Sequence, residues 1–69
     1  MTPMAQIVHD IAHVQFLAYQ EGLPPPSHVT LVPEEYAAVI EWFDENAPAT
    51  HGLGSRSPLK VLGMEVRCA

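Results

Sequence analysis

Cysteine is nearly absent from this chain, since Cys68 is the only one among 69 residues. A single cysteine cannot form an intrachain disulfide, and it gives no indication of an oxidising compartment. A chain of this length buries only about 60% of the surface that its unfolded form exposes, so its own core contributes about 3–5 kcal/mol. We therefore expect a second source of stability, either a metal ion or a partner chain.

Basic residues are also scarce. The chain has 3 Lys and Arg residues against 8 Asp and Glu residues, which gives a net charge of −5, and no Lys or Arg precedes Arg56. Because phosphate binding needs clustered Lys and Arg, nucleic acid is excluded as a partner for most of this surface. An acidic surface of this kind attracts a basic protein or, in the alternative interpretation, only keeps the domain soluble.

Long apolar runs are missing as well. The chain has no stretch of 18 or more predominantly apolar residues, and its first residues, Met-Thr-Pro-Met, carry no basic side chain. These absences argue against both a membrane span and a secretory signal. We expect a cytoplasmic protein without a membrane partner.

The first structural element is predicted to be a helix over residues 4–21. At about 100° per residue, its apolar side chains fill an arc of roughly 200°, which is wider than the face of a helix that docks on one small core. The sequence therefore predicts an oligomer interface on this helix. Its predicted residues are Ile7, Val8, Ile11, Phe16 and Tyr19. Gly22 is expected to end the helix as a left-handed cap.

Three consecutive prolines separate this helix from the rest of the chain. Residues 23–26 are expected to form a stiff, extended connector. The alternation of residues over 28–32 predicts a short strand. Pro33 suits the first position of a second helix, which is expected to end at residue 46, and the two glutamates after it suit the positive end of the helix dipole.

The last part of the chain is predicted to be a loop and then a strand. Residues 47–58 have the composition of a flexible loop. Residues 59–68 are predicted to form one strand, or a hairpin with a two-residue turn at Gly63-Met64, because glycine fits the first position of a type II′ turn. The predicted fold is therefore a small single α+β domain, residues 1–69, in which two short strands are packed by two helices. Two strands alone make a marginal sheet, so we expect oligomerisation to complete it.

Histidine is the residue type with the most potential for chemistry. His9 and His13 lie four residues apart on one helix face, a spacing that presents two imidazoles to one metal ion. Further ligands of such a site would come from His28, His51 and Cys68. None of the recognised zinc spacings is present, so metal binding is an alternative and no cofactor is expected. The carboxylates of the second helix are expected on an exposed face, which does not favour general acid catalysis, and we predict no enzymatic activity.

One face of the second helix gathers acidic side chains beside an aromatic one. An exposed aromatic residue with a charged rim is typical of an interaction hot spot, so this face is predicted to bind a basic partner. The predicted partner-binding residues are Glu34, Glu41, Trp42, Asp44, Glu45 and, in the following loop, Arg56. In the alternative interpretation, Trp42 belongs to the core and the acidic residues only solvate the helix.

The segment 29–67 combines a short strand, a helix that opens with Val-Pro-Glu-Glu-Tyr, a variable loop and the run Pro-Leu-Lys-Val-Leu-Gly-Met-Glu-Val. With Tyr36 in the helix and residues 62–66 in the last strand, this segment resembles small uncharacterised proteins of tailed bacteriophages. The resemblance implies no catalytic residues, and it implies a virion accessory or a modulator of a host protein, located in the virion or in the host cytoplasm.

The sequence as a whole favours a small non-enzymatic protein that binds its own copies and another protein. The resemblance makes a phage-encoded modulator of a host protein the leading interpretation. The alternatives are a structural component of virion assembly and a small metal-binding domain that uses His9 and His13.

Overall fold

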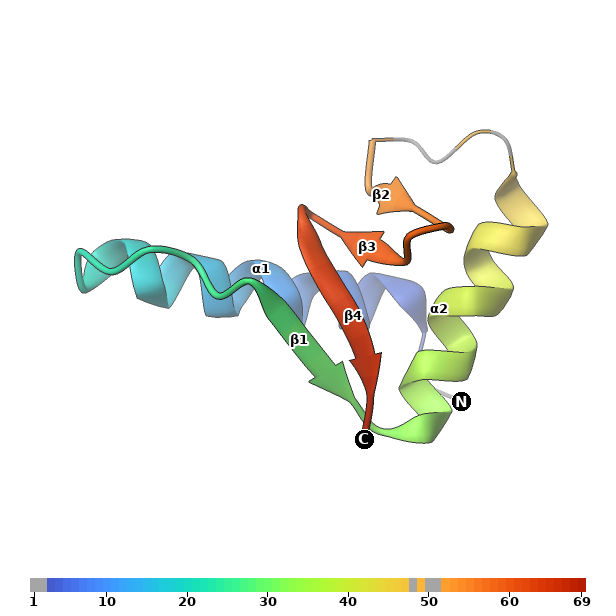
Figure 1. Cartoon of the computed structure of the whole chain (residues 1–69), viewed down its shortest axis with the longest axis horizontal. Coiled ribbons are helices and arrows are strands. Elements are labelled where there is room, and N and C mark those ends of the chain that lie inside the picture. Colours follow the sequence, from blue (N-terminus) through green and yellow to red (C-terminus); the bar gives the residue numbers. More distant parts are fainter. Residues whose placement is uncertain (1–2, 48, 50–51) are drawn as a thin grey trace.

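The computed structural model describes residues 3–47, 49 and 52–69, which form two helices and a four-stranded mixed sheet (Figure 1). In chain order, the elements are α1 (Met4–Gln20), β1 (His28–Leu31), α2 (Pro33–Asn46), β2 (Gly54–Ser55), β3 (Lys60–Val61) and β4 (Met64–Cys68). The predicted class, a small single α+β domain, is confirmed, whereas the predicted two-stranded sheet is corrected to four strands. Both predicted helices are present, with bounds within one residue of the prediction.

The local sequence accounts for the bounds of the helices. α1 ends in a Schellman cap at Gly22, which has a φ of 72°. The Gly22 amide donates to the Tyr19 carbonyl at 3.1 Å, and the next amide donates to the Ala18 carbonyl at 2.9 Å. α2 begins at Pro33, whose fixed φ suits the first helical position, and acidic residues fill its first turn.

The sheet has the strand order β1-β4-β3-β2, so the last strand in the chain lies inside the sheet. β1 pairs in parallel with β4, from His28 opposite Glu65 to Leu31 opposite Cys68. The β4–β3 and β3–β2 pairs are antiparallel. A parallel pair needs a long crossover connection, which here contains α2 and the first two strands of the C-terminal segment.

The turn between β3 and β4 lies one residue before its predicted position. Leu62 and Gly63 form it with φ values of 52° and 82°, the positive values that a type I′ turn requires at both central positions. Val61 therefore pairs with Met64, and both side chains are buried. An unbroken strand would place these two side chains on opposite faces, whereas the turn brings them to the same face.

β2 lies within residues 47–58, the segment that is predicted as a loop from its composition. Gly54 approaches β3 so closely that a Cβ atom at this position would overlap the Lys60 carbonyl group. A glycine that is typical of flexible loops thus allows two backbones to pair here. Residues 48, 50 and 51 of the predicted loop lie outside the described residues.

The core consists of buried side chains from both helices and the sheet. They are Ile7, Ile11, Leu31, Val39, Phe43, Val61, Met64 and Val66. The assignment of Ile7 and Ile11 to an oligomer interface is corrected, because these side chains are 1% and 2% exposed inside the chain's own core. One side of the wide apolar arc of α1 is therefore covered by the chain itself.

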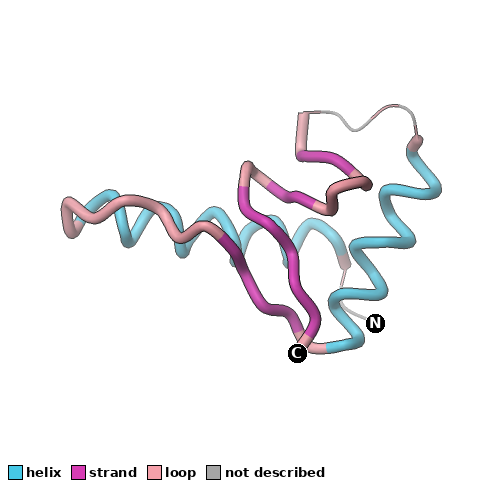
Figure 2. The backbone as a smooth tube through the Cα atoms, in the orientation of Figure 1, coloured by secondary structure: helices cyan, strands magenta, loops and turns pink. Residues whose placement is uncertain are grey.

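α1 extends well beyond the sheet, as Figures 1 and 2 show. The connector after it runs back along its last turns, and together they form a projection that we call the arm, residues 14–27. Gln15 ties the root of the arm to the hairpin, because its Nε2 donates to the Leu62 carbonyl at 2.8 Å. The projection gives the chain its elongated dimensions of 36 × 22 × 19 Å.

Candidate interaction surfaces

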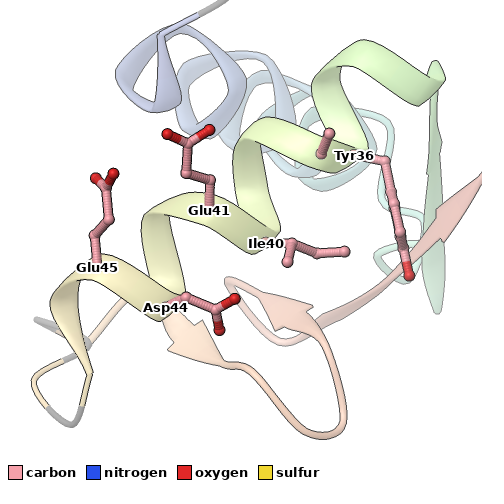
Figure 3. Close-up of a pocket in the computed structure, with 6 residues that line it drawn as sticks. Tyr36, Ile40, Glu41, Asp44 and Glu45 are labelled. Atoms are coloured by element: carbon pink, nitrogen blue, oxygen red, sulfur yellow. The ribbon is translucent and has the colours of Figure 1, made fainter.

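The outer face of α2 carries an open depression of about 490 Å³, which we call the α2 depression (Figure 3). Its lining residues form two rows with four-residue spacing along the helix, Tyr36-Ile40-Asp44 and Ala37-Glu41-Glu45. Residues four apart lie one above the other on a helix, so the depression is the groove between two such rows. It has an apolar floor at one end and carboxylates at the other.

The acidic side chains of this face are exposed to solvent, as predicted for Glu34, Glu41, Asp44 and Glu45. In Figure 3, Glu41 and Glu45 project in the same direction, away from the hairpin, whereas Asp44 points toward it. Glu34 lies in the first turn of α2 and does not line the depression. The structure thus brings three of the four predicted carboxylates to one rim.

Arg56 lies against the same rim. Its Nε donates to Asp44 Oδ1 at 3.1 Å, and the two side chains are 48% and 60% exposed. An ion pair this exposed contributes at most about 1 kcal/mol to stability, so a partner's cation could replace Arg56 at low cost. The structure therefore brings Arg56 to the acidic face, where it neutralises one carboxylate and leaves Glu41 and Glu45 as the outward charges.

Trp42 does not lie in the α2 depression. It is half-buried, packs against the core and makes an edge-to-face contact with Phe43, with ring centroids 5.2 Å apart. The aromatic residue that lines the depression is Tyr36, and Ile40 lies one turn after it. Tyr36 is half-buried too and also packs against the core. The sequence signal for Tyr36 and Ile40 is the four-residue spacing Tyr36-Ile40-Asp44, which places them at the border of the acidic face.

The second candidate surface is an apolar stripe on α1 that is exposed except at Val8, which is half-buried and packs against the core. Its five residues, Ala5, Val8, Ala12, Phe16 and Tyr19, fall within an arc of about 80° at 100° per residue. We call it the outer stripe of α1. Its centre lies roughly 120° around the helix from Ile7 and Ile11. Phe16 is 53% exposed and Tyr19 is 81% exposed, so the aromatic end of the stripe is open to solvent.

The arm carries further exposed apolar side chains. Val14, Leu17 and Leu23 are each at least 40% exposed. A hollow of about 330 Å³ lies beside Tyr19, lined by Gln15, Tyr19, Leu23 and Pro25. So much exposed apolar surface on a projection of a small chain is typical of an interaction site.

The histidines of α1 stack on each other. The rings of His9 and His13 are parallel to within 2°, with centroids 6.5 Å apart, and both residues are exposed. Within residues 3–47, 49 and 52–69, no group of three or more His, Cys, Asp and Glu residues is placed to hold a metal ion. His28 contacts Ser27 instead, and Cys68 is exposed on β4. His51 lies outside the described residues.

Glu65 on β4 is part of a local ion pair. Arg67 Nε donates to Glu65 Oε1 at 3.0 Å, and this hydrogen bond, with the positive charge of the guanidinium, lowers the pKa of the Glu65 carboxyl. Both side chains are about half exposed. The perturbed carboxyl therefore belongs to a solvated pair on the surface of the sheet and not to a water-excluding pocket.

Among the residues that the structure describes, no helix is long and apolar enough to cross a membrane. Comparisons of the chain with protein-family models, curated proteins and solved structures found no match. The candidate functional surfaces of the chain are therefore the α2 depression and the outer stripe of α1.

Proposed function

We propose that this chain is a non-enzymatic protein-interaction domain that self-associates and binds a partner protein with a basic surface. The observation that carries the proposal is the α2 depression, in which Tyr36 and Ile40 provide an apolar floor and Glu41 and Glu45 provide an outward acidic rim. An apolar centre with a polar rim is the usual anatomy of a protein interface.

The charge of the rim specifies the partner. Carboxylates on an exposed helix attract Lys and Arg over several ångströms, which raises the association rate more than it raises affinity. Tyr36 is suited to anchor the contact, because tyrosine is enriched among interface residues with large binding contributions. The expected partner surface therefore has basic residues around an apolar side chain that fits between Tyr36 and Ile40.

The exposure of the same carboxylates is the argument against catalysis. Glu41, Asp44 and Glu45 lie along one open helix face, where water reaches them from outside. General acid–base catalysis needs a group held against a substrate in a site that restricts water. An open acidic face serves recognition better than it serves a chemical step.

The proposal is tested by charge reversal on the rim. Glu41→Lys combined with Glu45→Lys should leave folding nearly intact, because exposed charges contribute little to stability. Asp10→Lys combined with Glu21→Lys is the matched control, since it changes the net charge by the same amount at residues that do not line the α2 depression. The tagged proteins are used to capture partners from a bacterial lysate and from phage-infected cells, with identification by mass spectrometry.

The supporting result is a basic protein that the unmodified chain and the control retain and the rim variant loses. With that protein purified, the rim variant should associate about tenfold more slowly or worse at low salt and show a weaker salt dependence. A host protein would support a modulator of the host, and a virion protein would support an assembly component. Equal capture by all three proteins, or equal loss in rim variant and control, would refute binding through the α2 depression.

A further inference from the structure

We infer that the outer stripe of α1 binds the same stripe of a second copy of the chain, with the two helices antiparallel and a twofold axis at Ala12. This inference rests on the self-association part of the proposed function. It specifies the surface, the direction and the register of that association.

The spacing of the stripe is symmetric about Ala12. Ala5 and Tyr19 lie seven residues to either side of it, and Val8 and Phe16 lie four residues to either side. An antiparallel pair therefore brings Tyr19 of one copy over Ala5 of the other, and Phe16 over Val8. The two Ala12 residues meet at the centre, where their small size allows the helix axes to approach to about 8 Å.

The sizes of the side chains favour this direction over a parallel one. In a parallel pair, Tyr19 would face Tyr19 and Phe16 would face Phe16 at one end, while Ala5 would face Ala5 at the other. The bulky aromatic pairs would then hold the two helices apart at the alanine end, which would leave a void there. Close packing requires large residues opposite small ones, which only the antiparallel register provides along the whole stripe.

The charges favour a second copy as the occupant of this surface. Each copy has a net charge of −5, so two copies repel unless they meet where acidic residues are absent. The stripe has none, and Glu21 is the only Asp, Glu, Lys or Arg between residues 11 and 33. Glu21 and the nearest earlier acid, Asp10, fall on the opposite side of the helix from the stripe.

The other candidate surface would not pair with itself in this way. Self-association through the α2 depression would place six carboxylates, Glu41, Asp44 and Glu45 of each copy, in one interface. Like charges placed side by side suppress association. The two surfaces therefore divide the roles, with a neutral surface for a second copy and an acidic surface for a basic partner.

The exposed aromatic area is sufficient to contribute a large part of a specific interface. A buried aromatic side chain covers about 150–250 Å². With exposed fractions of 53% and 81%, Phe16 and Tyr19 would together remove at most roughly 270 Å² of surface per copy, or about 540 Å² per pair. A specific interface of standard size begins at about 1,200 Å² in total, so these two residues would supply at most nearly half of that minimum.

The direction and register are tested with engineered cysteines. Cys68→Ser removes the native thiol, and Ala12→Cys or Ala5→Cys is then introduced singly. In the antiparallel pair, the two residues at position 12 meet, whereas the two at position 5 lie about 21 Å apart along the helix. A disulfide needs Cα atoms within about 7 Å. Under mild oxidation, the variant with Cys at position 12 should form a covalent dimer and the variant with Cys at position 5 should not.

The surface is tested with a charge at the crossing point. Ala12→Glu places two carboxylates face to face in the dimer but leaves the monomer intact, because Ala12 is exposed and glutamate is a good helix former. Leu17→Glu is the matched control, since it adds the same charge on another side of α1, outside the stripe. Sedimentation equilibrium should show that Ala12→Glu weakens the dimer at least about 100-fold and that Leu17→Glu changes it less than about threefold. Far-ultraviolet circular dichroism checks that both variants stay folded.

Each result supports or overturns the inference. A dimeric chain with these responses supports it. A dimer that survives Ala12→Glu would refute the outer stripe as the dimer surface. A covalent dimer through position 5 would refute the antiparallel direction. Neither result would refute self-association. A chain that is monomeric at high micromolar concentration would overturn both, without affecting the separate test of the α2 depression.

Discussion

The two halves of α1 belong to one helix, yet they differ in what covers them. In the first half, Ile7 and Ile11 are buried against the sheet, whereas in the second half Phe16 and Tyr19 are exposed. The helix phase does not change between them, since Val14 points in nearly the same direction as Ile7 and Ile11. Val14 is nevertheless 40% exposed, although it lines a small hollow together with Val29 and Leu31 of β1. Helical periodicity thus shows which side is apolar, and the size of the sheet decides how much of that side the chain can cover itself.

The largest expected effect is a difference in the loss of stability between substitutions in the first and in the second half of α1. Ile11→Ala should lower the free energy of unfolding by about 2–5 kcal/mol, because it opens a cavity in the core. Leu17→Ala should cost less than about 1 kcal/mol, because Leu17 is 45% exposed and alanine favours the helix. Urea unfolding followed by circular dichroism at one protein concentration measures both. Equal losses in the two variants would mean that the arm is as well packed as the core.

A smaller expected effect concerns local opening along α1. Amides of residues 8–11 should exchange with solvent at least about tenfold more slowly than those of residues 17–20, because only the first group lies under the sheet. Hydrogen exchange measured by nuclear magnetic resonance on the whole chain resolves the two groups. Raising the protein concentration should narrow the difference if a second copy covers the arm. Equal protection in dilute protein would contradict the contrast between the two halves.

The smallest expected effect is that of metal removal, which concerns the histidines on the polar side of α1. Treatment with a strong chelator should leave the melting temperature unchanged within about 1 °C. His9 and His13 are exposed and, among the described residues, belong to no group of three ligands. A structural metal ion would contribute on the order of 10 kcal/mol of folding free energy. A fall of many degrees, together with one zinc ion per chain, would revive the metal-binding alternative.

Most of the fold follows from local chemistry. Pro33 and Gly22 mark helix bounds because their backbone conformations suit those positions, and both elements begin or end where the sequence predicts. The hairpin turn was harder to place, because Gly63 fits the first position of a type II′ turn as well as the second position of a type I′ turn. The type I′ turn that forms here requires a positive φ at Leu62. The local preference of leucine disfavours this backbone conformation, and the pairing of β3 with β4 stabilises it. The sequence around Gly54 does not indicate whether this residue lies in a strand or in a loop.

The candidate surfaces were predictable in part. The acidic face of α2 follows from charge pattern alone. The charge pattern does not decide whether Trp42 or Tyr36 is the aromatic residue of this face, because both lie at borders of the apolar side of α2 and both pack partly against the core. The four-residue row that Tyr36 shares with Ile40 and Asp44 is the sequence feature that points to Tyr36. The same limit applies to Ile7 and Ile11 on α1, since a 200° apolar arc does not show which part meets the chain's own core.

The position of β4 inside the sheet has a consequence for folding during synthesis. β1 is made early, but in this sheet its hydrogen-bonding partner is residues 64–68, which leave the ribosome after every other described element. Until then, the core lacks the side chains of Met64 and Val66, and exposed apolar segments of nascent chains are prone to aggregate. The whole domain must therefore close in one late step. A ribosome stalled before residue 64 should hold a chain that binds chaperones strongly.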